Sequence, residues 1–351
     1  MAGPLQLIAT APMGLEAVVA RELKELGYED TVVENGRVNF TGDLIDICRC
    51  NLWLRTSDRV LIKMGEFTAV TFDELFEGTK ALPWQDFIPA DGEFPVEGRS
   101  HKSQLSSVPA CQGIVKKAIV DKLQQSYHTE WFEETGPRYV IEVNLLNDKA
   151  LLTLDTTGPA LHKRGYRKHA TEAPLKETMA AAMIGWNIAP GLRRTFNAER
   201  WPVIPAELWQ QARDEAIDAV RDDVPLNIAG SDIDPDAIEI AKAAAKSAGL
   251  ANEIKFDCLP AVKIQPQGDY GVMITNPPYG ERIGEEKEVR KLIAQLGRVM
   301  AGLPTWSFFA LTPTKQFEHD FQRKADKRRK LFNGRIECQL LQYLGPLPPR
   351  H

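Results

Sequence analysis

The chain has 351 residues, of which 43% are hydrophobic, and its formal net charge at pH 7 is −5. A chain of this length can bury substantial cores and is expected to divide into two or three domains. No apolar stretch approaches the roughly 18 residues of a membrane span, and no basic segment precedes a long apolar one at the N-terminus. We therefore expect a soluble, cytoplasmic protein.

The first 155 residues alternate short strands and helices. Residues 5–12 predict a strand, residues 15–27 predict an amphipathic helix that Gly27 closes, and Asn35-Gly36 is a strong hairpin signal. We further expect helices over 43–55, 72–82 and 109–125, and strands over 59–69, 93–101, 139–147 and 149–157. This α+β pattern has no obvious catalytic cluster, so it favours a binding or positioning role.

A change in composition at residues 158–178 (GPALHKRGYRKHATEAPLKET) indicates a linker into the second half. There the pattern predicts strands over 225–234, 252–259, 270–275 and 305–313, with helices over 234–250 and 286–303. Strands that alternate with helices are typical of an α/β fold with a doubly wound, mostly parallel sheet.

Acidic residues stand at the ends of two of these strands. Asp232 ends the strand over 225–234, and Asp234 with Pro235 opens the following helix. A carboxylate in this position can accept both hydroxyls of a ribose, but Asp before Pro is also a common helix N-cap, and both interpretations stay open. Asp257 ends the next strand and is a candidate for contact with an adenine amine.

The stretch ITNPPYGERIG (274–284) follows the buried strand YGVMIT. In an open α/β sheet, ligands bind at the carboxyl ends of the strands. Pro277 and Pro278 lack backbone donors, so the turn presents mainly acceptors, among them the side-chain oxygen of Asn276. Tyr279 adds an aromatic face on which an extruded base could stack. These four residues suit the exocyclic amine of a nucleobase.

Positive charge is concentrated in the second half of the chain. Residues 1–160 carry 15 Lys and Arg against 24 Asp and Glu, whereas residues 161–351 carry 28 against 24. Two basic runs dominate, HKRGYRKHA (162–170) and RKADKRRK (323–330). An isolated basic run is more often a solvated helix face or linker, but two runs beside a base-binding motif favour a nucleic-acid partner.

The cysteines and histidines argue against a metal site. The five cysteines are odd in number and lack CxxC spacing, which is typical of reduced thiols, and the six histidines include no HExxH or HxH. We expect no structural metal. The cysteines are Cys48, Cys50, Cys111, Cys258 and Cys338.

The order of strand, acidic ribose ligand, second strand and Asn-Pro-Pro-Tyr resembles amino-methylating S-adenosylmethionine-dependent methyltransferases. Six stretches extend the resemblance over nearly the whole chain and are similar to the bacterial large-subunit ribosomal RNA guanine-N2 methyltransferase family, many of whose members carry older names as N6-adenine DNA methylases. The stretches are LIATAPMGLEAVVARELKELGYE, FPVEGRSHKSQLSSVPACQGIVKKAIVDKL, LHKRGYRKHATEAPLKET, AMIGWNIAPGL, GSDIDPDAIEIAKAAA and TNPPYGERIG.

The resemblance implies a ferredoxin-like unit at 1–45, a THUMP RNA-binding domain at 46–157, a linker at 158–178 and a Rossmann-like α/β methyltransferase domain at 179–351. It implies S-adenosylmethionine as the cofactor, RNA (23S rRNA or a pre-ribosomal particle) as the partner, and methylation of guanine N2. By the same resemblance the Asn276–Tyr279 turn holds the guanine and Asp232 binds the cofactor ribose. Lys176 and Glu177 lie in the segment that leads into the cofactor pocket.

One part of the family pattern is missing. Members place a strand and a Gly-rich turn (D-P-x-C-G-S-G) where KETMAAAMIGWNIAPG (176–191) here joins two helical segments directly, and no G-x-G occurs in the chain. Such a turn lets backbone approach the cofactor, and its real deletion would abolish cofactor binding. We hypothesise that the sequence omits a segment near Ala182 and Met183. In addition, Pro260 stands where an adenine-contacting Asp is expected, which leaves Asp257.

Two other functions stay open. N6-adenine methylation of DNA is one, because the Asn-Pro-Pro-Tyr turn accepts either amine, although the THUMP-like stretch KSQLSSVPACQ favours RNA. The other is a non-catalytic RNA-binding or ribosome assembly protein on a methyltransferase scaffold. The candidate RNA-binding residues are Lys102, Ser103, Lys163, Arg164, Arg167, Lys327 and Arg328. A surface β-turn explains Lys102 and Ser103 nearly as well as a phosphate contact.

Overall fold

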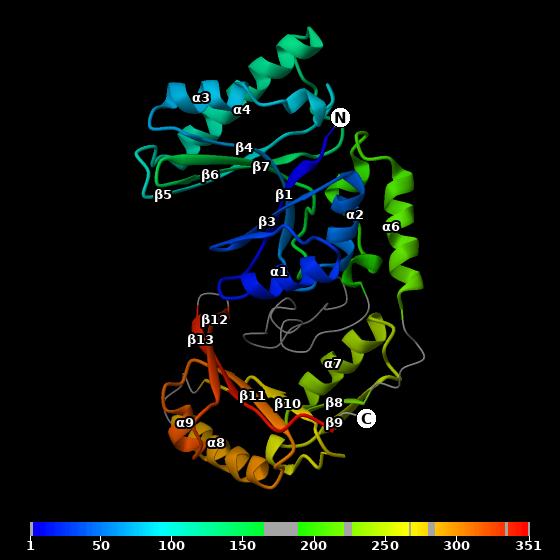
Figure 1. Ribbon diagram of the computed structural model, residues 1–351, viewed down its shortest axis with the longest axis vertical. Coiled ribbons are helices and arrows are strands. Elements are labelled where there is room, and N and C mark those ends of the chain that lie inside the picture. Colours follow the sequence, from blue (N-terminus) through cyan, green and yellow to red (C-terminus); the bar gives the residue numbers. More distant parts are fainter. Residues whose placement is uncertain are drawn as a thin grey trace. The chain divides into compact units, whose positions relative to one another are not determined.

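The computed structural model describes residues 3–164, 189–220, 227–266, 268–279, 285–333 and 336–349. These residues form two compact units (Figure 1). Unit 1 holds residues 3–164 and 189–220, and unit 2 holds the described residues from 227 onward. No helix among the described residues is long and apolar enough to cross a membrane.

Unit 1 is built on one seven-stranded sheet in the order β2-β3-β1-β4-β7-β6-β5. All neighbours in it are antiparallel except β5 and β6. Because β1 pairs directly with β4, the sheet runs without a break from the N-terminal strands into those that follow residue 46. Its strands are β1 (Leu5–Thr10), β2 (Val32–Glu34), β3 (Arg37–Gly42), β4 (Arg59–Thr68), β5 (Val96–His101), β6 (Val140–Leu146) and β7 (Lys149–Asp155).

The local signals in the first half are confirmed. The β2–β3 hairpin turns at Asn35-Gly36, where Gly36 has a φ of 76° that a left-handed turn position requires. The helices are α1 (Glu16–Glu25), α2 (Leu44–Trp53), α3 (Phe72–Lys80) and α4 (Val108–Tyr127). A capping box begins α2, with Asp43 and Asp46, and another begins α3, with Thr71 and Glu74, which satisfies backbone N–H groups that have no partner inside the helix.

Residues 189–220 pack onto unit 1. They contain the short helices η2 (Pro190–Arg193) and η3 (Asn197–Arg200) and the helix α6 (Ala206–Asp218), none of which the sequence analysis predicted. The Trp201 ring stacks on Tyr139 with centroids 4.6 Å apart, and both side chains are fully buried. The Glu215 carboxylate of α6 accepts two hydrogen bonds of 2.7 Å from the Arg49 guanidinium of α2. The described chain beyond residue 188 therefore completes the core of unit 1 before unit 2 begins.

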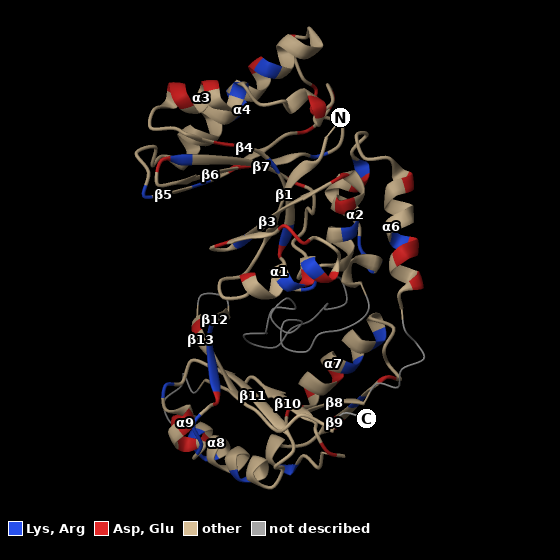
Figure 2. Cartoon of the chain, viewed as in Figure 1, with Lys and Arg blue, Asp and Glu red and all other residues tan. Residues whose placement is uncertain are grey.

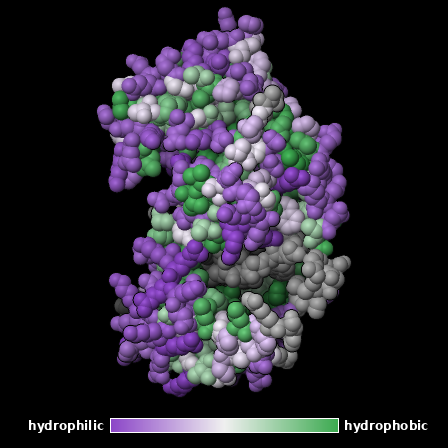
Figure 3. All heavy atoms as spheres, in the orientation of Figure 1, coloured by the Kyte–Doolittle hydropathy of each residue, from purple (hydrophilic) through white to green (hydrophobic). Residues whose placement is uncertain are grey.

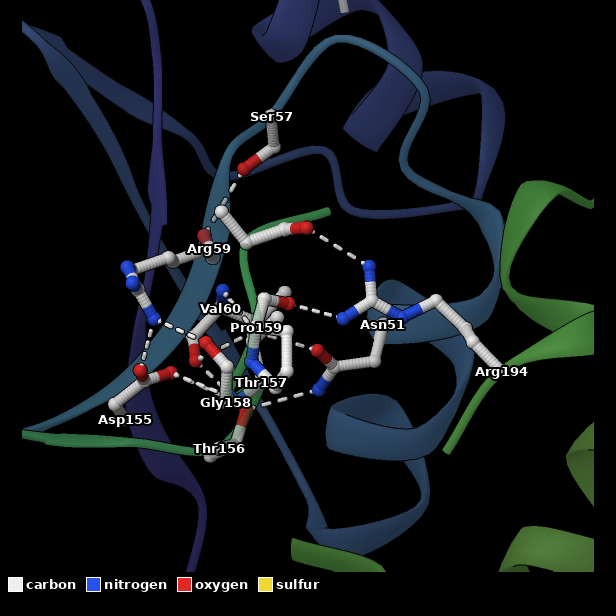
Figure 4. A network of polar contacts seen from close by, with 11 residues as sticks. Asn51, Ser57, Arg59, Val60, Asp155, Thr156, Thr157, Gly158, Pro159 and Arg194 are labelled. Carbon is white, nitrogen blue, oxygen red and sulfur yellow. Dashed lines mark hydrogen bonds and ion pairs between the residues drawn. The ribbon is translucent and has the colours of Figure 1, made fainter. Parts of the chain in front are cut away.

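A buried polar network fixes the end of β7 (Figure 4). The Asp155 carboxylate pairs with the Arg59 guanidinium of β4 and accepts a hydrogen bond of 2.8 Å from the Thr157 backbone N–H. The Asn51 amide of α2 donates to the Thr156 hydroxyl at 2.8 Å and accepts from the Thr157 hydroxyl at 2.7 Å. Because the network joins β4, β7 and α2, it sets the path on which the chain leaves the sheet.

Unit 2 contains the alternating elements that the second half predicted, now in two sheets. Strands β8 (Ile228–Asp232) and β9 (Ile254–Cys258) pair in parallel, and α7 (Pro235–Ser247) connects them. The second sheet has the order β10-β11-β13-β12, in which β10 and β11 are parallel and the other pairs antiparallel. Its elements are β10 (Val272–Thr275), α8 (Glu285–Ala301), β11 (Ser307–Thr312), α9 (Phe317–Asp320), β12 (Lys327–Asn333) and β13 (Ile336–Tyr343).

The basic run 323–330 is not a solvated helix face or a linker. Residues 327–330 belong to β12, the edge strand of the four-stranded sheet, whose basic residues are drawn in blue in Figure 2. Lysine and arginine on an edge strand discourage pairing with a second chain, and this explains a strand that carries so much charge. Phe308, Phe321 and Tyr343 stack behind the sheet, with 5.0 Å between the Phe308 and Phe321 centroids.

The two sheets of unit 2 are separated where a parallel sheet would be continuous. In the part of the chain that the structure describes, no strand pairs with the free edge of β8 or of β10. Apolar residues at these two strands are exposed, Ile233 by 70% and Val272 by 58%, whereas strands of a doubly wound sheet are normally covered on both faces. Among the described residues, no strand therefore lies between Asp232 and the Asn-Pro-Pro-Tyr turn in the sheets of unit 2.

The pH dependence of stability tests the buried carboxyl of Asp155. Burial raises the pKa of Asp155 to about 6, although Arg59 opposes this shift, and the ordinary value is about 4. The folded protein therefore holds this proton more tightly than the unfolded chain, so the wild type loses stability as the pH rises through that interval. Relative to Asp155→Asn, which cannot titrate, the free energy of unfolding of the wild type should fall by about 1–3 kcal/mol between pH 4 and pH 7.

Urea denaturation followed by tryptophan fluorescence measures this difference, since Trp84 and Trp201 of unit 1 are fully buried. A wild type that gains stability over the variant with rising pH would show that the Arg59 charge outweighs burial.

Candidate active site

The Asn-Pro-Pro-Tyr turn leaves the carboxyl end of β10. Thr275, the last residue of β10, pairs with Ala310 of the parallel strand β11. Pro277 is buried and anchors the turn, whereas Asn276 and Pro278 are exposed. The structure therefore places the Asn276 amide at the surface of a strand end, as the sequence analysis predicted, next to two residues that have no backbone N–H to offer.

The Tyr279 phenol is engaged within the site. Its hydroxyl donates a hydrogen bond of 2.9 Å to the Asn276 side-chain oxygen and accepts one of 3.3 Å from the Asn333 amide of β12. The thiol of Cys338, on β13, lies 3.7 Å from the same hydroxyl. Burial raises the pKa of Tyr279 to about 12, so the phenol stays protonated at neutral pH.

This arrangement refines the role expected of Tyr279. The sequence suggested only a stacking surface, but the phenol also orients the Asn276 amide. An amide oxygen has two lone pairs, so Asn276 can accept from Tyr279 and still accept from an incoming amine. Asn333 and Cys338 were missed because they lie on the β12–β13 hairpin, which the charge-dense sequence did not predict.

The carboxylates of Asp232 and Asp234 have different partners at the end of β8. Asp232 is exposed at the end of β8, and its carboxylate accepts from the backbone N–H of Asp234 at 3.0 Å. Asp234 is the N-cap of α7, and its side chain accepts from the N–H of Asp236 at 2.9 Å. The N-cap interpretation therefore holds for Asp234, and the second oxygen of Asp232 has no hydrogen-bond donor among the described residues.

Asp257 faces away from Asp232. In the β8–β9 register Ser231 pairs with Asp257, and Asp232 pairs with Cys258. Because successive side chains of a strand point to opposite faces, the carboxylates of Asp232 and Asp257 lie on opposite faces of the pair. Asp257 forms an ion pair of 3.5 Å with Lys255 on its own face.

The described residues fit one part of an S-adenosylmethionine site. They supply an exposed carboxylate, Asp232, at the end of β8 and a turn after β10 in which Asn276 is exposed. They supply no strand and no Gly-rich turn between these two, where backbone would meet the methionine end of the cofactor. Lys176, Glu177 and the Ala182–Met183 junction lie outside the described residues, so the hypothesis of an omitted segment stays a prediction.

The candidate RNA-binding residues fall into two groups. Lys102, Lys163 and Lys327 are exposed, and their ammonium groups have no partner in the part of the chain that the structure describes. The others have structural contacts, and Arg167 lies outside the described residues. Ser103 bonds to His101 and to the backbone N–H of Asp148, Arg164 donates to the Arg55 carbonyl, and Arg328 pairs with Glu318.

The Ser103 hydroxyl joins the loop after β5 to the β6–β7 connection, because it donates to the His101 carbonyl and accepts from the Asp148 N–H. Lys102 in the same loop has a φ of 50°, at which the backbone turns sharply.

Over α8, α9 and the β12–β13 hairpin, the face of the molecule shown in Figure 3 is mostly hydrophilic. No group of three or more His, Cys, Asp or Glu suited to a metal occurs among the described residues.

Three family models match successive parts of the chain. The RlmL ferredoxin-like domain matches residues 6–61, the THUMP domain residues 69–155, and the RMKL-like methyltransferase domain residues 181–342. Together they follow the order in which the sequence analysis placed a ferredoxin-like unit, a THUMP domain and a methyltransferase domain.

Known proteins resemble the chain over almost its whole length. "Putative RNA methyltransferase YpsC" of Bacillus subtilis is 47% identical, over 98% of this chain and 97% of its own. "Ribosomal RNA large subunit methyltransferase K/L" of Syntrophotalea carbinolica is 31% identical over 98% of this chain, which spans only 54% of that relative. The crystal structure of SMU.472, "a putative methyltransferase complexed with SAH", is 43% identical with a TM-score of 0.93 and covers 99% of this chain and 100% of its own.

The alignments bear on the omitted segment. The match to the Bacillus relative extends over 374 positions, more than the 351 residues of this chain. That relative therefore contains residues that face gaps in this chain. Such gaps are consistent with an omitted segment, and its place near Ala182 and Met183 stays a prediction.

Cofactor binding tests the same hypothesis. We compare the 351-residue chain with a variant that carries the strand and Gly-rich turn of the family between Ala182 and Met183. Because the 351-residue chain lacks these backbone contacts, it should bind S-adenosylhomocysteine at least ~100-fold more weakly than the variant. This difference in affinity corresponds to about 2.7 kcal/mol. Isothermal titration calorimetry measures both affinities. A Gly/Ser insertion of equal length is the control, and tight binding by the unaltered chain would contradict the hypothesis.

Proposed function

Because the chain belongs to the family of RNA methyltransferases that combine an RlmL ferredoxin-like domain, a THUMP domain and an RMKL-like methyltransferase domain, we propose that it methylates the exocyclic N2 of a guanine in large-subunit rRNA. The observation that carries the proposal is the Asn276–Tyr279 turn. Asn276 is exposed at a strand end, and its side-chain oxygen accepts a hydrogen bond from the half-buried Tyr279 phenol. The K/L relatives are named for the ribosomal RNA of the large subunit, and this chain spans about half of their length.

The cofactor is S-adenosylmethionine, since this is a methyltransferase family and a similar structure contains SAH. When bound, it supplies an activated methyl group on a sulfonium, a good leaving group, so a strong general base is not required. We propose that Asp232 holds the ribose through the carboxylate oxygen that has no donor among the described residues. Asp257 is a candidate for the adenine amine, and Asp234 and Lys176 are further candidates for contact with the cofactor. The Asn276 oxygen accepts a hydrogen bond from the guanine amine. This contact orients the amine nitrogen for attack on the methyl carbon of the cofactor.

We propose a separate role for each domain. Residues 1–45 and 46–157 bind and position RNA, residues 158–178 connect the domains, and residues 179–351 carry the chemistry. The seven-stranded sheet of unit 1 fits a binding role, because its strands form one continuous sheet over one large hydrophobic core. We propose RNA contacts for the exposed lysines Lys102, Lys163 and Lys327, and a cytoplasmic location where rRNA is processed.

Methylation of DNA adenine is the less favoured alternative. The acceptor geometry of Asn276 suits either amine, but the THUMP domain at 69–155 favours an RNA substrate. A non-catalytic RNA-binding protein is a second alternative, and the observation that favours it is that no described strand lies between β8 and β10. The affinity for S-adenosylhomocysteine decides between this alternative and the enzyme.

The Asn276→Ala substitution tests the proposed chemistry. In the form of the chain that binds the cofactor, it should lower methyl transfer to a large-subunit rRNA transcript at least ~100-fold, because the acceptor for the target amine is lost, which costs about 3 kcal/mol of transition-state stabilisation. Binding of the transcript should stay within a few fold. Incorporation of tritiated methyl groups, followed by nucleoside digestion and mass spectrometry, measures the rate and identifies N2-methylguanosine.

The matched control is Asn252→Ala, which removes an exposed asparagine of unit 2 outside its strands and helices. Loss of both methylation and RNA binding in Asn276→Ala would assign the residue a structural role. N6-methyladenosine as the product, or methylation of DNA in preference to RNA, would replace guanine N2 as the target.

A further inference from the structure

Unit 1 contains a pocket whose polar side chains are mostly basic. It has a volume of about 640 Å³ and lies where residues 159–163 meet residues 192–195 and α6. We call it the basic pocket. Among the described residues it is lined by Pro159, Lys163, Leu192, Arg193, Arg194, Thr195 and Arg213. Four of the seven are cationic, and no carboxylate lines it in this part of the chain.

Two of the arginines build the walls of the pocket. The Arg194 guanidinium donates hydrogen bonds to the carbonyls of Pro159, Ala160 and Lys163, with 2.9 Å to Ala160, and Figure 4 shows it reaching toward this segment. The Arg213 guanidinium donates to the carbonyls of Leu192 at 3.0 Å and Arg194 at 2.9 Å. These side chains position the backbone, so their replacement would alter the shape of the pocket.

The other polar side chains face solvent. Lys163, Arg193 and Thr195 are exposed, and the Lys163 ammonium has no hydrogen-bond partner among the described residues. The ammonium of Lys163 and the hydroxyl of Thr195 come from two separate segments of the chain, and the exposed Arg193 guanidinium, which also has a contact within the protein, lies beside them. Lys, Arg and Thr side chains are common donors to phosphate oxygens in complexes with nucleic acids.

Positive charge accumulates around these residues. Burial lowers the pKa of Arg194 to about 10, and the neighbouring positive charges of Arg164 and Arg59 lower it further, against the opposing effect of Asp155. In addition, the Arg194 Nε lies buried without a hydrogen-bond partner. Asp155 pairs with Arg59 and Glu199 pairs with Arg213, so Lys163 and Arg193 are the lining cations that a bound anion would meet at the exposed side of the pocket.

We propose that the basic pocket binds phosphates of the RNA backbone, with Lys163 and Arg193 as the phosphate ligands and Arg194 and Arg213 as positioning residues. This inference rests on the proposed function, because it takes RNA to be the substrate. The Asp155 network fixes the start of this segment, and the Arg194 guanidinium holds the carbonyls of Ala160 and Lys163, so the backbone that carries Lys163 is anchored at both places. Such contacts hold RNA in one register on unit 1 and carry no sequence information.

The salt dependence of RNA binding tests the proposal. For the double variant Lys163→Gln/Arg193→Gln, the dissociation constant for a large-subunit rRNA transcript should rise about 10–100-fold at 0.1 M KCl. The slope of log K against log salt concentration should become shallower by about 1 for each lost phosphate contact. Filter binding over a series of KCl concentrations measures both quantities. The fold is checked by the thermal unfolding midpoint, which should not change because both side chains are exposed.

The matched control is Arg21→Gln/Lys24→Gln, which removes the same charges from the exposed face of α1 and should leave the slope within about 0.5 of the wild type. An equal loss in control and double variant would overturn the pocket and indicate general charge attraction. Inorganic pyrophosphate provides a second probe. If it raises the unfolding midpoint of the wild type only, while both variants bind RNA like the wild type, the pocket is a site for a small phosphate compound and the proposal fails.

The outcomes separate this proposal from the function it rests on. If the wild type does not bind the transcript more tightly than double-stranded DNA, the proposed function fails. If it binds RNA tightly and the double variant is unchanged, only the basic pocket is overturned.

Discussion

The buried ion pair between Asp155 and Arg59 is the interaction on which the organisation of unit 1 depends. It lies at the end of β7, where the central strands of the sheet finish and the chain departs toward residues 159–163. A buried carboxylate is costly unless it is paired and hydrogen-bonded, and here two backbone N–H groups and the guanidinium satisfy it. Because the Asn51 amide joins the same network, α2, β4 and β7 are fixed together. Pro159, the first residue that lines the basic pocket, follows Asp155 by four residues, so the network also fixes the start of the pocket.

A different constraint governs unit 2. The Asn276 turn and the Asp232 carboxylate each lie at the carboxyl end of a parallel strand, the position at which α/β sheets bind ligands. They belong to separate sheets in the described structure, and the exposed apolar residues Ile233 and Val272 show the cost of the separation. A strand inserted between β8 and β10 would pair with both free edges and cover these side chains. If a segment is omitted near Ala182 and Met183, as we predict, its return should affect folding as well as cofactor binding.

The elements with strong local signals could be predicted, and those defined by distant contacts could not. Periodic apolar residues, the Gly27 helix end and the Asn35-Gly36 turn identified β1–β7 and α1–α4, because each signal acts within a few residues. Strand β12 was missed because its basic residues face solvent on an edge strand, which leaves little apolar alternation to detect. Helix α6 was missed although it packs on α2, and the Tyr279–Asn333 contact joins residues 54 positions apart.

The sequence by itself determined the α/β alternation of the second half, the Asn-Pro-Pro-Tyr turn at a strand end and the family to which the chain is similar. These depend on local backbone preferences and on motifs whose residues are adjacent. Only the tertiary structure decided that Tyr279 orients Asn276, that Asp232 and Asp257 lie on opposite faces, and that Lys163 and Arg193 line one pocket. The physical reason is that such relationships depend on strand register and on packing between segments far apart in the chain, which no local pattern encodes.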